Sequence, residues 1–220
     1  MAIIRNGVNG SVSGKAGSVV FVHTMQGNYV RSLPKSKKGR KPSAEQLESR
    51  ARFRLVREKI CFILPLVRLG FAQCSPPKRA YDCAMSYNLR EAVMKTGDSY
   101  AMNWERFMIS KGLPNPIISY DIVIDHNSDI LHLTWEYDGH IERKYNLRSY
   151  HCYVLLYPES HLDNDSFIVN DTSSALSSMS QELSLVKRPH PVTYHAYAFF
   201  FAHDGSNKST DSKYLGVIQH

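Results

Sequence analysis

Two neighbouring stretches, ISYDIVIDH (residues 118–126) and DILHLTWEY (residues 129–137), decide the fold class. In both, apolar and polar side chains alternate, which is the period of a β-strand with one buried face. Only Asn127 and Ser128 separate the two stretches. They therefore predict an antiparallel β-hairpin.

Five further stretches rich in β-branched and aromatic residues follow, with turn residues between them. They are residues 149–158, 165–171, 182–187, 192–203 and 212–218. Seven short strands within about a hundred residues favour an immunoglobulin-like or fibronectin-like antiparallel β-sandwich. The Cys…Trp…Cys core of antibody domains is absent, but Trp135 in the second strand fits a core position.

The first part of the chain predicts a hairpin followed by helices. SVVFVHT (residues 18–24) and YVRS (residues 29–32) flank a glycine-containing turn, so they predict a hairpin, which Pro34 closes. The spacing of Ser43 and Gln46 is that of a capping box and predicts the start of a helix that runs to about Leu64. Pro65 should break or kink it, and a second helix fits residues 79–94.

The long helix has two different faces. Its apolar residues are expected to form the core face, and Arg50, Arg54 and Arg57 fall on a separate face. The predicted core positions are Leu47, Ala51, Phe53, Leu55, Val56, Ile60, Phe62 and Ile63.

The fold class is therefore predicted to be α+β, with a division near residue 114. A basic hairpin-plus-helix module is expected at residues 1–114 and an acidic β-sandwich domain at residues 115–220. We expect the sandwich to fold alone, because its strands alternate by themselves.

Charge is unevenly distributed along the chain. Residues 1–114 carry 20 Lys+Arg and 7 Asp+Glu, whereas residues 115–220 carry 7 and 13, within a net charge of +7. This asymmetry indicates either an acidic partner for the first half or neutralisation between the two halves. The candidate contacts to an anion or a partner are Lys35, Lys37, Lys38, Arg40, Lys41, Arg50, Arg54 and Arg57. The alternative is that these residues only form a solvated loop and helix face and contact no partner.

No pattern of reactive residues predicts a catalytic, metal or cofactor site. The nucleophile elbow, zinc-protease and Cys-His-Asn signatures are absent, and "GSVSGKAGS" lacks the spacing of a phosphate-binding loop. Cysteines 61, 74, 83 and 152 have no CxxC spacing and are expected to be reduced thiols, without a disulfide or zinc. We expect a protein that is not an enzyme and that has no small-molecule substrate.

The chain has no window of 18 consecutive apolar residues, and its N-terminus lacks the apolar core of a secretion signal. We therefore expect no membrane span and no signal peptide. The expected location is the cytoplasm or a particle assembled there.

The N-terminal motifs resemble an uncharacterised family of bacterial and prophage proteins. The resemblance rests on an SGKxGxVV hairpin, an Arg-Ser-x-Pro exit and a PxSxxQxxxRxxF helix start, with later matches at "AMSYNLREAV" and "SKYLGVI". The motif residues with an expected structural role are Gly14, Lys15, Gly17, Arg31, Pro34, Pro42, Ser43, Gln46 and Phe53. The family usually has Trp-Lys-Gly in the first turn, where this chain has "MQGN". The resemblance implies a fold and no established activity, and its phage-like contexts favour a role in a particle.

These observations predict a non-catalytic structural or assembly protein that docks through its basic N-terminal module. Its partner is expected to be another protein or a second copy of the chain. One alternative is a nucleic-acid-binding protein without sequence preference, since phosphate-neutralising charge dominates such affinity. A second alternative, a carbohydrate or cell-surface binding module, rests on the sandwich fold alone.

Overall fold

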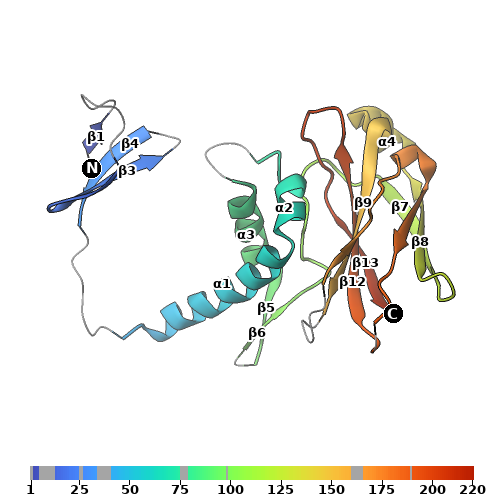
Figure 1. Cartoon of the computed structure of the whole chain (residues 1–220), viewed down its shortest axis with the longest axis horizontal. Helices are drawn as coiled ribbons and strands as arrows, with labels where there is room; N and C mark the ends of the chain where they lie inside the picture. Colours follow the sequence, from blue (N-terminus) through green and yellow to red (C-terminus); the bar gives the residue numbers. More distant parts are fainter. Residues whose placement is uncertain are drawn as a thin grey trace. The chain divides into compact units, whose positions relative to one another are not determined.

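The protein consists of two compact units, residues 1–47 and residues 48–220, and each is described by itself. The computed structural model describes residues 2–4, 13–24, 27–33, 41–74, 79–97, 99–159, 166–188 and 190–220 (Figure 1). The α+β class predicted from the sequence is confirmed, because helices and antiparallel sheets both build the fold.

The first unit is a four-stranded antiparallel sheet in the order β1-β4-β3-β2. The predicted hairpin is its centre, formed by β3 (Val19–Thr24) and β4 (Gly27–Ser32). The strands β1 (Ala2–Ile4) and β2 (Gly14–Ala16) extend it on either side. Of the described side chains of this unit, none is fully buried.

The second unit begins with helices, and the first of them is interrupted next to Pro65, as the sequence predicts. The helix α1 (Ala44–Phe62) starts in the first unit and continues into the second, and Pro65 lies in the first turn of α2 (Leu64–Gly70). Proline is tolerated there because its missing N–H would have no helical partner. The third helix, α3 (Ala80–Glu91), is shorter than predicted.

The predicted helix over residues 79–94 is wrong at its end. Val93 and Met94 belong to β5 (Val93–Thr96), which pairs with β6 (Ser99–Met102). Gly97, with φ +61°, makes the turn between these strands, and this left-handed conformation costs glycine little. The alternation in "VMKTGDSYAM" therefore outweighs the helix propensity of the preceding residues.

The β-rich part of the second unit contains the seven strands expected from the sequence. Two antiparallel sheets form, in the orders β11-β8-β7 and β10-β9-β12-β13. The strands are β7 (Ile117–Asp125), β8 (Ile130–Tyr137), β9 (Tyr150–Pro158), β10 (Ile168–Val169), β11 (Ser180–Ser184), β12 (Thr193–Ala202) and β13 (Lys213–Gln219). A short helix α4 (Gly139–Tyr145) and the 3₁₀ turns η1 (Leu147–Ser149) and η3 (Leu176–Ser178), which the sequence did not predict, lie in the connections.

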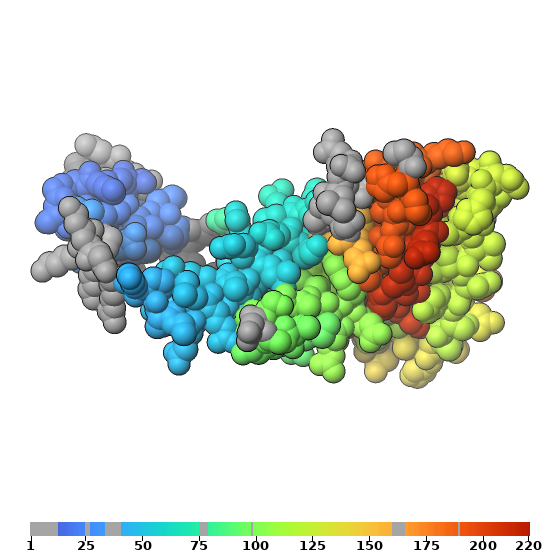
Figure 2. Space-filling model, turned by 90° about the horizontal axis from the view of Figure 1, so that it is seen from below, coloured from blue at the N-terminus to red at the C-terminus, as the bar shows by residue number. Residues whose placement is uncertain are grey.

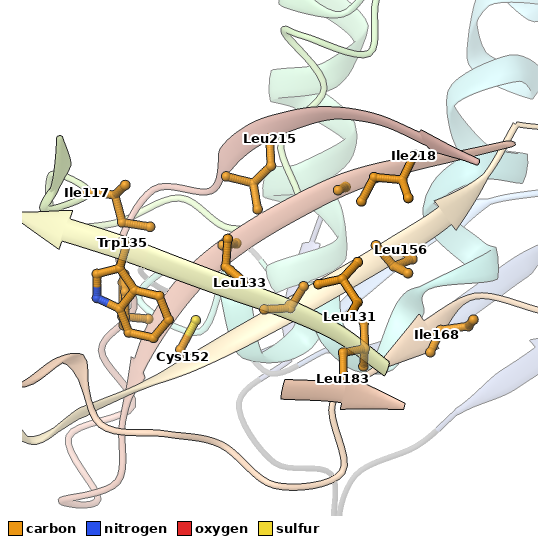
Figure 3. Close-up of a cluster of buried hydrophobic side chains, with 14 of the residues drawn as sticks. Ile117, Leu131, Leu133, Trp135, Cys152, Leu156, Ile168, Leu183, Leu215 and Ile218 are labelled. Carbon is orange, nitrogen blue, oxygen red and sulfur yellow. The ribbon is translucent and has the colours of Figure 1, made fainter. Parts of the chain in front are cut away.

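The two sheets enclose one apolar core (Figure 3). Leu131, Leu133 and Trp135 of β8 point towards Cys152 and Leu156 of β9. The indole N–H of Trp135 donates to the Leu176 carbonyl at 3.2 Å, so its polar atom is satisfied inside the core. The core position expected for Trp135 is confirmed.

A second core lies between the other face of the four-stranded sheet and the helices. Val56, Ile60 and Ile63 from the end of α1 and the residue that follows it pack in the same cluster as Tyr157 and Phe199 of the sheet. Leu155 and Tyr197 are also fully buried in this cluster. The strands β9 and β12 are therefore covered on both faces, which explains their almost continuous apolar sequences.

No helix within the described residues is long and apolar enough to cross a membrane.

From the second core we predict which fragments of the chain can fold. The large side chains Leu155, Tyr157, Tyr197 and Phe199 would be exposed to water in a fragment of residues 115–220. Exposure of each side chain costs roughly 1.5–3 kcal/mol of hydrophobic free energy, and the total is comparable to the whole stability of a typical domain. The division at residue 114 thus remains a prediction, but we now expect residues 115–220 alone to be molten or insoluble. Residues 48–220 should unfold cooperatively in a denaturant titration followed by circular dichroism. A cooperative transition of the shorter fragment would contradict this account.

The cysteines do not all occur as the reduced thiols expected from the sequence. Cys74, after α2, and Cys83, on α3, form a disulfide with a Cα–Cα distance of 6.6 Å, while Cys61 and Cys152 are free. The fold brings the two cysteines together because α2 packs against α3. Sequence spacing alone could not reveal this pairing.

The disulfide should be visible in a thiol titration. Unfolded, non-reduced protein is expected to show two reactive thiols per chain, and four after reduction. Closing a loop of about ten residues stabilises a fold by roughly 2–3 kcal/mol in the chain-entropy account. The double variant Cys74→Ser/Cys83→Ser should lose about that much free energy of unfolding. Four thiols before reduction would refute the pairing.

Candidate docking surface

The structure places the predicted basic residues in three groups. Arg50, Arg54 and Arg57 lie exposed on α1 in the second unit, and Lys41 lies exposed in the first unit. The other predicted contacts fall outside the described residues. They are Lys35, Lys37, Lys38 and Arg40.

The three arginines form one basic face of α1, because they are four and three residues apart on a helix. α1 reaches the molecular surface in Figure 2, where it is light blue. Within the described residues, none of the three guanidinium groups forms an ion pair with a carboxylate. The face therefore keeps its charge available for a partner.

Arg52 differs from these three arginines although it belongs to the same basic stretch. Its guanidinium donates to the Leu89 carbonyl at 2.9 Å and lies 5.9 Å from the centre of the Tyr100 ring. Its neighbour Glu48 contacts Lys95 at 3.4 Å. Arg52 thus connects α1 to α3 and β6, and its role is structural.

Three apolar residues predicted for the core side of α1, Leu47, Ala51 and Phe53, are instead exposed. Leu47 is 54% exposed and Phe53 is 47% exposed, whereas Val56 and Ile60 are fully buried. The apolar stripe is present along the whole helix, but the second core covers only its C-terminal half. Phe53 therefore lies at the surface next to Arg50 and Arg54 and adds an aromatic ring to the basic face.

The sheet of the first unit carries a second basic surface. Lys15 of β2 pairs with Val20 of β3, and Val20 pairs with Arg31 of β4. Directly paired residues in an antiparallel sheet point to the same face, so the three side chains form a row across the strands. Val22 and Tyr29 form the neighbouring pair on this face. We call this surface the basic sheet face.

The remaining residues of the family motif have roles in the backbone. Gly14, the first residue of β2, and Gly17, directly after that strand, have φ angles of +121° and +57°, which favour glycine. Ser43 Oγ accepts from the Gln46 amide, and Gln46 Oε1 accepts from the Ser43 amide, both at 3.3 Å. The predicted capping box is confirmed, directly after Pro42. Pro34 lies outside the described residues.

No arrangement of reactive side chains in the described residues forms a metal site. No group of three or more His, Cys, Asp or Glu among them is placed to hold an ion. Several histidines instead make ring contacts, such as the stack of His151 on His203 at 4.1 Å between ring centres.

A buried histidine, His195 on β12, makes contacts that sequence reasoning could not locate. Its ring stacks on Trp104 at 4.2 Å between centres, and its Nδ1 lies 3.0 Å from the Tyr214 hydroxyl. Its Nε2 is buried and has no hydrogen-bond partner in the described structure. Burial lowers the pKa of His195, the charge of Lys59 lowers it further, and the Glu159 carboxylate opposes both effects. The ring is therefore neutral at physiological pH, which matches its apolar surroundings.

The lowered pKa of His195 predicts a pH dependence of stability. The unfolded chain takes up a proton near pH 6.5, whereas the folded chain does so only at lower pH. The stability that the neutral His195 ring contributes is fully present above pH 6.5 and is lost as the pH falls through the pKa of the folded chain. We expect the free energy of unfolding to fall between pH 7.5 and pH 5 more steeply in the wild type than in His195→Gln. The difference in slope is at most about 1.4 kcal/mol per pH unit, and equal slopes in urea titrations would contradict the assignment.

Comparison with known proteins supports the resemblance noted in the N-terminal motifs. No curated protein matches the chain. A family model described as "Family of unknown function (DUF6266)" matches residues 11–216, which include the elements from β2 to β12 and the first part of β13. The chain therefore belongs to the DUF6266 family.

Proposed function

We propose that this protein is a non-catalytic structural or assembly protein that docks onto an acidic protein surface through its basic sheet face. The observation that carries this proposal is the row formed by Lys15, Val20 and Arg31, on a sheet in which no described side chain is fully buried.

The packing of the first unit supports a need for a partner. Val19, Val20, Phe21 and Val22 follow one another in β3, so apolar side chains lie on both faces of the sheet, and all of them are partly exposed. A small sheet needs a hydrophobic face or packing against another element for independent stability, and burial of that face supplies the stabilisation. A partner that covers this sheet would supply the burial that the described part of the unit lacks.

The charge of the basic sheet face determines the kind of partner. Lys15 and Arg31 flank Val20, so a complementary surface would bring carboxylates around an apolar centre. Complementary charge increases the association rate and excludes wrong partners. Residues 115–220, with 7 Lys+Arg and 13 Asp+Glu, make a second copy of this chain one such partner.

The β-rich part of the second unit fits the role of a rigid body in an assembly. We label β7, β8 and β9 as strands A, B and C, β10 as strand C′, and β11, β12 and β13 as strands E, F and G. With these labels, the two sheets have the strand orders E-B-A and C′-C-F-G. This order supports the immunoglobulin-like or fibronectin-like sandwich expected from the sequence, an architecture common in surface and adhesion modules.

The setting in a phage-like particle rests on the resemblance of the N-terminal motif. The Cys74–Cys83 disulfide weighs against the expected cytoplasmic location, because disulfides are typical of oxidising compartments.

A second candidate function, nucleic-acid binding without sequence preference, is favoured by the basic face of α1. Arg50, Arg54 and Arg57 could neutralise phosphates, and exposed Phe53 could stack on a base. Because the two basic surfaces lie on different units, separate variants can distinguish the two functions.

The test compares three variants of the full chain. Lys15→Gln/Arg31→Gln removes the charge of the basic sheet face, and Arg50→Gln/Arg54→Gln/Arg57→Gln removes that of α1. The control is Arg148→Gln, an exposed cation on η1. Apparent mass is measured by light scattering between 50 and 500 mM salt, DNA binding is measured over the same salt range, and partners are captured from the native host. We expect association that weakens with salt and is lost in the sheet variant only.

Two results would overturn the proposal. One is a wild-type monomer at every salt concentration with no captured partner. The other is DNA binding that falls, with a shallower salt dependence, only in the α1 variant, which would establish the second candidate instead.

A further inference from the structure

A cavity in the second unit lies between the end of α2, the helix α3 and the loop before β7. Its volume is about 390 Å³, which is within the range of small-ligand pockets. Its lining residues are Phe71, Gln73, Cys74, Cys83, Ser86, Tyr87, Arg90, Lys111 and Gly112. We call it the helix pocket.

One wall of the helix pocket is a single face of α3. Cys83, Ser86, Tyr87 and Arg90 are spaced by three, one and three residues, so they follow one another along the same side of the helix. The opposite wall is the chain that leaves α2, and the Cys74–Cys83 disulfide joins the two walls covalently.

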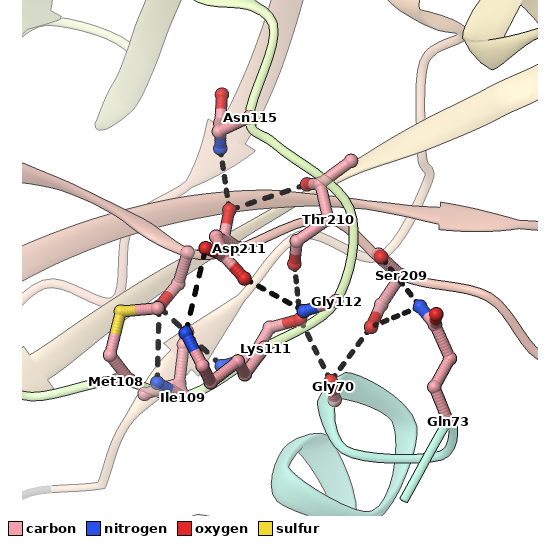
Figure 4. A network of polar contacts seen from close by, with 12 residues as sticks. Gly70, Gln73, Met108, Ile109, Lys111, Gly112, Asn115, Ser209, Thr210 and Asp211 are labelled. Atoms are coloured by element: carbon pink, nitrogen blue, oxygen red, sulfur yellow. Dashed lines mark hydrogen bonds and ion pairs between the residues drawn. The ribbon is translucent and has the colours of Figure 1, made fainter. Parts of the chain in front are cut away.

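A network of hydrogen bonds fixes the walls (Figure 4). The Gly70 carbonyl accepts from the hydroxyls of Ser110 at 3.0 Å and Ser209 at 2.7 Å. Gln73 Nε2 donates to the Ser209 carbonyl at 2.7 Å. A Cβ at Gly112 would lie 2.1 Å from the Ser209 carbonyl oxygen, so only glycine fits this position of the wall.

The same network ties the Lys111 loop to the segment before β13. The Gly112 amide donates to Asp211 Oδ1 at 2.7 Å, and the Lys111 amide donates to the Gly70 carbonyl at 3.0 Å. The helix pocket is thus formed before any ligand binds, which reduces the entropy lost on binding.

The charged groups of the helix pocket are cations. Arg90 and Lys111 line it, and no carboxylate is among its lining residues. Lys111 Nζ lies 4.8 Å from the centre of the Tyr87 ring and 3.8 Å from Asp211, and Arg90 lies 3.9 Å from Glu91. Both ion pairs are long and solvent-exposed, so they hold the cations weakly. Tyr87 and the disulfide add an apolar surface beside them.

We propose that the helix pocket binds a small organic anion, with a phosphate or carboxylate group held by Arg90 and Lys111 and an apolar or aromatic part against Tyr87 and the disulfide. Arginine and lysine bind such groups through charge-assisted hydrogen bonds. The Ser86 hydroxyl supplies a further donor. This ligand site is independent of the basic sheet face, because it lies wholly in the second unit.

The experiment is a titration of the isotopically labelled full chain with phenyl phosphate, followed by two-dimensional NMR. The amide signals of Ser86, Tyr87 and Gly112 should shift in a saturable manner. Benzoate should shift the same signals, while neutral phenol and inorganic phosphate should bind more weakly, because each lacks one of the two contacts.

Variants locate the binding site. Arg90→Gln and Lys111→Met should each weaken phenyl phosphate binding about tenfold, the effect of losing one charge-assisted contact. Arg148→Gln and Lys15→Gln/Arg31→Gln should leave it unchanged, so the result does not depend on the docking proposal. Each variant's amide spectrum also reports whether it remains folded. The proposal is overturned if the pocket signals do not move, if phenol binds as well as phenyl phosphate, or if folded Arg90→Gln and Lys111→Met bind like the wild type.

Discussion

The structure of the second unit depends on burial of both faces of one strand pair, β9 and β12. Along β12, Ala196, Ala198 and Phe200 face the three-stranded sheet, and Tyr197, Phe199 and Phe201 face the helices. Because successive side chains of a strand point to opposite faces, one register serves two cores at once. A shift of β12 by one residue would move large aromatic rings into the space that alanine side chains occupy on the opposite face. The pairing of β9 with β12 is therefore specified more strongly than that of a strand with one buried face.

The two units differ in how far their apolar side chains are buried. In the second unit, helices and sheets cover one another, and even Trp135 finds a carbonyl for its indole N–H. In the first unit, β3 is as apolar as a core strand, but its side chains remain partly exposed. This contrast, together with the row of Lys15, Val20 and Arg31, is why we assign docking to the first unit.

Much of the fold could be predicted from the sequence because its signals are local. Alternation located β7 and β8, and the Ser43–Gln46 spacing located the start of α1 to within a residue. The features that could not be predicted depend on which elements meet. Phe53 continues the apolar stripe of α1, yet it is exposed because the second core ends before it. Cys74 and Cys83 pair only because α2 and α3 lie together, and the helix pocket needs three separate segments. The cationic face of α1 was thus predictable as a cluster of charges, whereas Lys15 and Arg31, for which the sequence predicted only a structural role, were not recognised as one surface.

The distribution of cysteines has a practical consequence for the study of α1. Cys74 and Cys83 are bonded, Cys152 is buried, and Cys61 is exposed, so one thiol of the native chain is open to reagents. Cys61 lies four residues after Arg57 and seven after Arg54, on the same side of the helix. A fluorophore or spin label attached to the natural sequence would therefore report directly on the surroundings of the three arginines, without an engineered attachment point.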